Sequence, residues 1–139
     1  MATGTIQTDR IRVVLLFKRK EGLTLDEFYQ HWFEGLSKML LASPIFTDNV
    51  LKYEQLRIDN ETMAMLKTVG FEPPEPEWDG MALLEAESFD KIFSIFQSEE
   101  YKTVIGPYED KFLERKAAQI FPLKFAVFLD ETKSTGLHL

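Results

Sequence analysis

The apolar run at residues 11–18 constrains the fold more than any other feature of this chain. It reads Ile-Arg-Val-Val-Leu-Leu-Phe-Lys, and every residue from Val13 to Phe17 is apolar. Because successive side chains of a β-strand point to opposite faces, such a strand presents apolar groups on both sides. The run therefore predicts a strand that is buried on both faces of its sheet.

An amphipathic helix is predicted directly after this strand. Thr24 suits the N-cap position, and Asp26 and Glu27 suit the first turn, where acidic side chains interact favourably with the helix dipole. Apolar residues then recur at steps of three and four, and the helix is expected to end before Pro44. These apolar residues are Leu25, Phe28, Trp32, Leu36, Met39 and Leu40.

A second strand and an insertion follow the helix. Residues 49–59 predict a strand in which Leu51, Tyr53, Gln55 and Arg57 share one face. Residues 60–78 form the insertion, with a short helix expected within 61–69 and an acidic, proline-rich loop over 70–77. A surface excursion is the expected role of this segment, with a lid or a dimer arm as alternatives.

The second half of the chain repeats the plan of the first. Residues 79–86 predict a strand, and Ser88 predicts the N-cap of a phenylalanine-rich helix. Ser98 restarts a helical turn, Gly106 and Pro107 interrupt it, and another helix is expected over residues 108–119. Pro122 then opens a last strand at 123–130. A polar tail at 131–139 follows, and it contains His138, for which no role is expected.

This order of elements predicts an α+β fold in one domain of 139 residues. Two βαβ halves make a ferredoxin-like βαββαβ sandwich, in which helices cover one face of a four-stranded antiparallel sheet. The other face of the doubly apolar strand then needs a second cover. Pairing two sheets face to face across a two-fold axis supplies it, so a homodimer is expected.

Composition excludes several classes of function. A net charge of −7 argues against nucleic-acid partners and anionic membranes, which require a basic face. With no cysteines and two histidines, the chain has no thiol chemistry and little with which to build a metal site. No glycine-rich phosphate loop is present, and no cofactor is expected. No apolar segment reaches the length of a membrane span, so a cytoplasmic protein is predicted.

Four segments of the chain form a recognisable pattern: Phe28-x-x-His31-Trp32, Tyr53-x-Gln55, Trp78-Asp79-Gly80 and Glu100-Tyr101-x-x-Val104-x-x-Pro107-x-Glu109-x-x-Phe112. Together they resemble the EthD-like family of dimeric α+β barrels, especially its fungal members that resemble polyketide cyclases and decarboxylases. The resemblance implies the fold and the dimer predicted above. Family members include cofactor-free cyclases and decarboxylases of aromatic polyketides, quinone-forming oxygenases and proteins without known activity.

The chain departs from the family pattern where a general base is expected. The family helix usually closes on a histidine at the position of Leu36, which lies within about 20° of the apolar centre of the helix. Arg57 replaces a second histidine that the family often carries after Tyr-x-Gln. Leucine cannot transfer a proton, so any activity depends on other residues.

The candidate catalytic residues are Tyr53, Arg57 and His31. Tyr53 and Arg57, with Gln55 between them, offer a phenol, a fixed cation and an amide that suit a phenolate or carboxylate. The alternative is a row of edge-strand side chains that bond across the dimer. His31 matches a family position but lies about 120° from the apolar centre of its helix, where a flank or interface residue is expected.

The other candidates would bind an aromatic substrate. Glu85 shares a strand face with Met81 and Leu83, and either acts as an acid, pairs with Arg57 or lies solvated at the strand end. Remaining acidic residues of the second helical region are interpreted as solvated. Apart from Gln55 and Glu85, the substrate-binding set is Phe17, Tyr29, Trp32, Leu36, Phe89 and Phe93, with Phe28 and Phe96 as further core aromatics.

Three functions follow from these features. The leading hypothesis is a cofactor-independent lyase or cyclase that positions an aromatic polyketide-type substrate and stabilises its enolate. The second is a cofactor-free oxygenase of anthrone-like phenols. The third is a non-catalytic dimer that binds an aromatic ligand, and Leu36 favours it because the expected base is missing.

Overall fold

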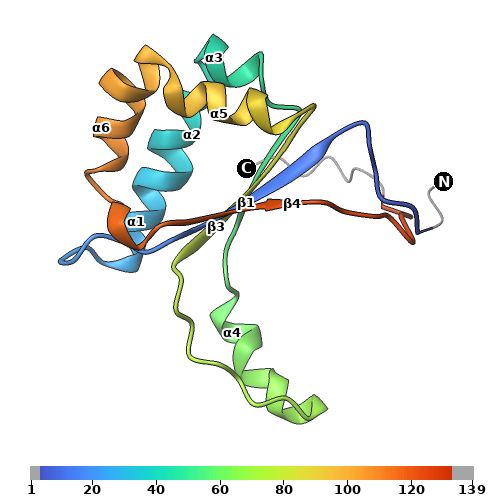
Figure 1. The fold of residues 1–139 in the computed structure, drawn as a ribbon. Helices are drawn as coiled ribbons and strands as arrows, with labels where there is room; N and C mark the ends of the chain where they lie inside the picture. The colour runs from blue at the N-terminus through green and yellow to red at the C-terminus, as the bar shows by residue number, and fades with distance from the viewer. Residues whose placement is uncertain (1–3, 133–139) are drawn as a thin grey trace.

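A four-stranded antiparallel sheet forms the centre of the computed structural model, which describes residues 4–132. Its strands are β1 (Ile11–Phe17), β2 (Lys52–Leu56), β3 (Gly80–Ala86) and β4 (Gln119–Leu123), in the order β2-β3-β1-β4. Figure 1 shows the helices of the two βαβ halves gathered on one side of this sheet, while the segment between β2 and β3 stands apart from them. The α+β class and the ferredoxin-like arrangement predicted from the sequence are confirmed.

The apolar strand β1 lies between β3 and β4, so it is hydrogen-bonded along both edges. Val13 is paired with Leu84 of β3 and with Pro122 of β4. Pro122 has no N–H to donate, and it is tolerated because β4 is an edge strand. The last strand runs from Gln119 to Leu123, so the strand predicted over residues 123–130 was wrong except at Leu123.

The first helical region begins at Thr24 with a capping box, in which Thr24 and Glu27 bond each other's backbone N–H groups. It continues as α1 (Leu25–Tyr29), a π-helical segment η1 (Gln30–Leu36) and α2 (Ser37–Leu41). The helix thus ends before Pro44, as predicted. Pro44 itself opens the short helix α3 (Pro44–Thr47).

The second helical region begins at Ser88, whose side chain caps α5 (Phe89–Gln97). A π-helical segment η3 (Tyr101–Ile105) leads directly into α6 (Gly106–Glu109). The interruption predicted at Gly106 and Pro107 was wrong, because Pro107 lies in the first turn of α6, where proline is tolerated.

The helix predicted over residues 108–119 was also wrong beyond Glu109. Phe112 and Leu113 are buried, and the backbone around them bonds the segment after β1. The Lys20 N–H donates to the Phe112 carbonyl at 2.8 Å, and the Glu114 N–H donates to the Lys18 carbonyl at 3.0 Å. These bonds replace helical ones, and only a short 3₁₀ turn, η4 (Arg115–Ala117), follows.

The segment between β2 and β3 projects away from the sheet, as the green part of Figure 1 shows. It contains α4 (Asn60–Met63) and the 3₁₀ segment η2 (Ala64–Val69), in agreement with the short helix expected there. Three of its apolar side chains, Met65, Val69 and Phe71, are exposed. Within the described residues, this excursion adds nothing to the helix layer.

The sheet face opposite the helices is uncovered, and its centre is apolar, while Arg12 and Glu85 form an ion pair near one end of it. Val14, Leu16 and Leu83 lie on it half-buried, and Phe121 of β4, which is paired with Val14, is 44% exposed. Such a face on a single chain leaves apolar area in water, which disfavours the monomer. Among residues 4–132, none of the helices has the length and apolarity that crossing a membrane requires.

Candidate functional site

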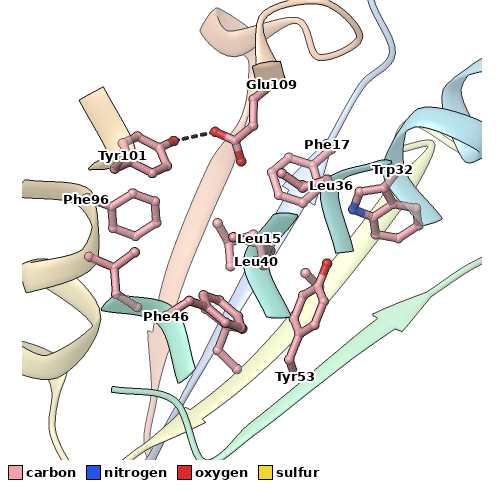
Figure 2. Close-up of a pocket in the computed structure, with 13 residues that line it drawn as sticks. Leu15, Phe17, Trp32, Leu36, Leu40, Phe46, Tyr53, Phe96, Tyr101 and Glu109 are labelled. Carbon is pink, nitrogen blue, oxygen red and sulfur yellow. Dashed lines mark hydrogen bonds between the residues drawn. The ribbon is translucent and has the colours of Figure 1, made fainter. Parts of the chain in front are cut away.

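A cavity of about 50 Å³ lies between the helices and the covered face of the sheet. A wider pocket of about 370 Å³ adjoins it and shares five of its lining residues, Leu15, Phe17, Phe96, Tyr101 and Glu109. Most of the lining is apolar, and few polar groups enter it (Figure 2). The other residues that line the inner cavity are Trp32, Leu36, Leu40, Phe46, Tyr53, Ala82, Leu84 and Ile95.

One polar cluster stands where the cavity and the pocket meet. The Tyr101 hydroxyl donates a 2.5 Å hydrogen bond to Oε1 of Glu109. Arg115, which lines the wider pocket, donates to the Tyr101 hydroxyl at 3.2 Å, and its guanidinium lies 3.5 Å from the same Glu109 oxygen. Hydrogen bonds from described residues reach only Oε1, and Figure 2 shows the second carboxylate oxygen directed into the cavity.

The environment of Glu109 raises the pKa of its carboxyl group, so the protonated form is more favourable there than it is in water. Its side chain is 12% exposed. Burial raises the pKa of the carboxyl above its usual 4.5, although the hydrogen bond from Tyr101 and the charge of Arg115 act in the opposite direction. Burial, together with the nearby Glu109 charge, also raises the pKa of Tyr101 to about 12. Tyr101 is therefore a neutral donor and Glu109 a carboxylate suited to accept a proton.

A second polar group, the hydroxyl of Tyr53, enters the opposite side of the cavity from β2 (Figure 2). The amide Nε2 of Gln55 donates to this hydroxyl at 2.6 Å and to the carbonyl of Trp32 at 2.9 Å. A backbone carbonyl only accepts hydrogen bonds, so the Gln55 atom beside it is the nitrogen. Burial raises the pKa of Tyr53 to about 12, so its hydroxyl keeps its proton.

Four of the residues predicted from the sequence line this cavity: Phe17, Trp32, Leu36 and Tyr53. Leu36 ends the π-helical segment η1 and points toward the sheet, as its angle on the helix indicated. It adds an apolar wall at the position of the family histidine. Gln55 does not line the inner cavity but fixes the Tyr53 hydroxyl from behind.

Two of the predicted catalytic residues lie elsewhere. The guanidinium of Arg57 stacks 4.2 Å from the ring centre of Tyr29 and borders an open groove beside α1. Tyr29 donates its hydroxyl hydrogen bond to the Asp79 carbonyl at 3.2 Å. His31 stacks on Phe112 and lies 3.1 Å from the Tyr108 hydroxyl. Neither Arg57 nor His31 lines the cavity that contains Tyr53.

Glu85 lies on the uncovered face of the sheet, away from the cavity. It is buried there between two guanidinium groups, at 3.1 Å from Arg10 and 2.7 Å from Arg12. The pairing with Arg57 that the sequence suggested does not form, because Arg57 lies beyond the other end of the sheet. His138 lies outside the described residues.

Phe89 and Phe93 stack on each other along α5, outside the cavity lining. Phe96 of the same helix is the phenylalanine that borders both the cavity and the wider pocket. Phe28, in contrast, is fully buried among core aromatics, as expected.

Tyr101, Glu109 and Arg115 were not predicted as site residues, and the expectation that acidic residues here are solvated was wrong for Glu109. The two residues Tyr101 and Glu109 are eight positions apart, a spacing that leaves two side chains about 80° apart around a regular α-helix. The π-helical turn in η3 is wider, so eight residues make about two full turns and both side chains face the cavity. A pattern based on 3.6 residues per turn therefore aligns this pair less closely than the structure does.

Solved structures of similar fold agree with this architecture. An ethyl tert-butyl ether D family protein of Bacillus halodurans has a TM-score of 0.56 and 16% identity, covering 81% of this chain and 95% of its own. A dimeric protein of ferredoxin-like fold and unknown function from Bacteroides fragilis has a TM-score of 0.55 and 14% identity, covering 88% of this chain and 100% of its own. An EthD-like protein of Ralstonia eutropha has a TM-score of 0.52 and 12% sequence identity, and the match covers 87% of this chain and 92% of the Ralstonia chain.

Among curated proteins no sequence matches this chain. The part of the chain that the structure describes contains no cluster of three or more histidine, cysteine or acidic side chains arranged to hold a metal ion. The EthD domain profile matches residues 20–116, which include both helical regions, strands β2 and β3, Tyr53, Tyr101 and Glu109. This protein therefore belongs to the EthD family.

Proposed function

We propose that this protein is a cofactor-independent lyase or cyclase that acts on an aromatic polyketide-type intermediate, either closing a ring with loss of water or removing a carboxyl group. The observation that carries the proposal is Glu109, a carboxylate with a raised pKa at the wall of an apolar cavity. The Tyr53 hydroxyl faces it from the other side (Figure 2). A base opposite a neutral donor suits the formation of an enolate.

In the ring closure, Glu109 removes a proton from a carbon that lies between two carbonyl groups. The C–H electron pair moves into the carbonyl and forms an enolate, which Tyr53 stabilises through a hydrogen bond. The enolate carbon then attacks another carbonyl of the same chain. The attacked carbonyl oxygen becomes an alkoxide and takes the proton held on Glu109. Glu109 then removes the second proton from the carbon that attacked, and the electron pair of that C–H bond forms the new C=C bond as the hydroxyl group leaves. The departing hydroxyl takes this second proton from Glu109 and is released as water.

Tyr101 and Arg115 prepare Glu109 for this role. Both groups contact Oε1, so they orient the carboxylate and leave its second oxygen to face the substrate. They also hold the pKa of Glu109 below the value that burial alone would give. A base is most effective when its pKa lies near the working pH. Burial outweighs the effects of Tyr101 and Arg115, so the pKa of Glu109 is raised from its usual value toward neutral pH. His31 and Arg57 are assigned to the packing of the first helical region.

The dimensions of the site suit a substrate that enters from the wider pocket. The inner cavity of about 50 Å³ has room for a few atoms, since a single water occupies roughly 10–15 Å³ on the same measure. The adjoining pocket of about 370 Å³ suits an aromatic ring. We assign the reacting carbonyl to the inner cavity and the preformed ring or ketide chain to the pocket.

We also propose that the protein is a homodimer that pairs its sheets face to face. The centre of the uncovered face is apolar where β1, β3 and β4 lie side by side, and a second copy would bury Val14, Leu83 and Phe121. The similar protein of Bacteroides fragilis is described as dimeric, which supports the same assembly here.

A panel of aromatic polyketide acids tests the proposed function. Each compound is incubated with the unmodified protein and with Glu109→Gln, with and without oxygen, and the products are resolved by mass. Turnover without oxygen that is lost in Glu109→Gln is the expected result. Turnover only with oxygen would instead support an oxygenase of anthrone-like phenols. Binding without turnover of any compound would support a non-catalytic aromatic-ligand carrier.

A further inference from the structure

The indole nitrogen of Trp32 has no hydrogen-bond acceptor within residues 4–132, although the side chain is fully buried. A buried donor without a partner is unfavourable, and native proteins contain few of them. Figure 2 shows this nitrogen on the side of the ring that faces the cavity. Trp32 lines the cavity, so an acceptor group that enters at this end is the partner that the buried N–H lacks.

The Tyr53 hydroxyl is a second donor at the same end of the cavity, and none of the residues 4–132 accepts its proton. Its oxygen accepts the 2.6 Å hydrogen bond from Gln55 Nε2, so the phenolic proton is not used in that contact. In Figure 2 the hydroxyl of Tyr53 points toward the indole side of Trp32. The two donors come from different elements, η1 and β2, and the bond from Gln55 to the Trp32 carbonyl ties these elements together.

We propose that Trp32 Nε1–H and Tyr53 Oη–H together form an oxyanion subsite, which binds the carbonyl oxygen of the substrate and stabilises it as an enolate or phenolate. This inference rests on the proposed function, because Glu109 would be the base that creates the negative charge. When the C–H bond breaks, its proton moves to Glu109 and its electron pair moves to the oxygen held by the two donors. No oxidant or reductant takes part in this step.

The surroundings strengthen both donors. Phe17, Leu36 and Leu40 line the same cavity, so water has little access to compete for the substrate oxygen. A hydrogen bond to a negative oxygen in such a place is stronger than the same bond in water. Gln55 acts as a positioning residue, because its amide holds the Tyr53 hydroxyl in the orientation that frees the proton. Leu36 takes part as an apolar wall that requires no partner.

The subsite selects ligands that carry an anionic or strongly polarised oxygen on a planar framework. A 1,3-diketone and an acidic phenol have this character, and nitrobenzene matches the size of a phenol without an ionisable oxygen. We therefore choose 4-nitrophenol as the probe and nitrobenzene as its matched control. The wider pocket of about 370 Å³ has room for either ring.

Indole resonances give a direct test, because the chain contains two tryptophans. In a ¹H–¹⁵N spectrum of the unmodified protein, the Trp32 indole proton should move downfield when 4-nitrophenol binds. The resonance of Trp78, which lies outside the cavity lining, should not move, and Trp78→Phe assigns the two signals. Nitrobenzene should leave the Trp32 proton close to its original position.

Affinity gives a second readout. Tyr53→Phe and Trp32→Phe should each weaken binding of 4-nitrophenol by about ten- to a hundredfold, the range expected for one hydrogen bond to a charged oxygen. Neither change should weaken binding of nitrobenzene by more than about threefold. The spectrum of the unmodified protein keeps the test decisive even if Trp32→Phe does not fold.

The result separates this inference from the proposed function. If 4-nitrophenol fails to bind, or binds without moving the Trp32 signal, the subsite is wrong, even where polyketide acids are turned over. If the Trp32 signal moves but no member of the polyketide panel reacts, the subsite stands and the proposed lyase or cyclase activity is wrong.

Discussion

The hydroxyl of Tyr101 donates a 2.5 Å hydrogen bond to Oε1 of Glu109, and both residues come from the second helical region. This contact joins a neutral phenol to a carboxylate that lines the cavity between helices and sheet. Burial makes the carboxylate a stronger base, and the hydrogen bond limits that effect. Glu109 is therefore the residue on which the proposed chemistry depends.

Replacing Glu109 with glutamine should abolish turnover without unfolding the protein. A general base contributes about 10²- to 10⁴-fold to a rate, so kcat/KM should fall by at least about a hundredfold. The amide oxygen of the new side chain still accepts the hydrogen bond from Tyr101, and the change removes a buried charge. The melting temperature should therefore be unchanged or higher at neutral pH. Kinetics and thermal unfolding of the variant measure the two effects.

The control for that variant is Glu99→Gln, which changes an exposed carboxylate in the same helical region. It should retain both the rate and the melting temperature of the unmodified protein. An equal loss of kcat/KM in both variants would contradict the assignment of Glu109 as the general base.

Removing the Tyr101 hydroxyl should shift the pH dependence of the reaction. The hydrogen bond from Tyr101 lowers the pKa of Glu109, and burial, which outweighs it, raises that pKa. In Tyr101→Phe the pKa of Glu109 should therefore rise further, and the acid limb of kcat/KM against pH should move to higher pH. Tyr108→Phe, whose hydroxyl bonds His31 outside the cavity, should leave the limb unchanged. An unchanged limb in Tyr101→Phe would contradict the assignment of Glu109 as the base.

Stability should fall at alkaline pH partly because of Tyr53. Its pKa is raised to about 12 in the folded protein, against 10.0 for the free phenol, so the fold favours the neutral form. This contribution is fully present below pH 10 and is lost as the pH rises through 12. Urea unfolding at pH 9 to 12 should show a smaller loss of stability in Tyr53→Phe. A loss equal to that of the unmodified protein would contradict the burial of this phenol.

Restoring the family histidine should destabilise this chain. Leu36 is 3% exposed and its neighbours are apolar, so Leu36→His buries an imidazole without a partner. We expect a cost of about 1–3 kcal/mol, measured by urea unfolding at pH 8. Leu41→His is the matched control, because Leu41 lies in the same helical region at 64% exposure, and it should cost less than about 0.5 kcal/mol.

A charge on the uncovered sheet face should separate the proposed dimer. Phe121→Glu places a carboxylate opposite Val14, where a second sheet would bury it. Sedimentation should then show monomers, while the unmodified protein sediments as a dimer. Phe71→Glu is the control, since Phe71 is exposed on the segment between β2 and β3, and it should remain dimeric. A monomer in the unmodified protein would contradict the assembly.

The sheet and the first helical region could be predicted from local patterns. The apolar run at Val13–Phe17 indicated the central strand, and Thr24 with Glu27 indicated where the helix begins. The region after Pro107 could not be predicted in the same way. There, hydrogen bonds from Lys20 to Phe112 and from Glu114 to Lys18 end the helix, and the partners are about ninety residues apart in sequence.

Local periodicity predicted part of the candidate site and missed its acidic residue. A period of two placed Tyr53, Gln55 and Arg57 on one face of the predicted second strand without deciding which way that face points, and the helical period placed Leu36 toward the sheet. In the structure both Tyr53 and Leu36 line the cavity. Glu109 was missed because it stands among charged residues of both signs that resemble a solvated surface, and because π-helical geometry brings it in line with Tyr101. The π-helical turn of η3, which holds more residues than an α-helical turn, leaves no clear signal in composition or spacing.

Proton abstraction by Glu109 can be measured without knowing the natural substrate. A phenyl-substituted 1,3-diketone is dissolved in D₂O, and the exchange of its central C–H protons is followed by ¹H NMR with each protein. The unmodified protein and Glu99→Gln should accelerate exchange over buffer, and Glu109→Gln should return it to the buffer rate. Exchange that is equally fast in Glu109→Gln and in the unmodified protein would contradict the account.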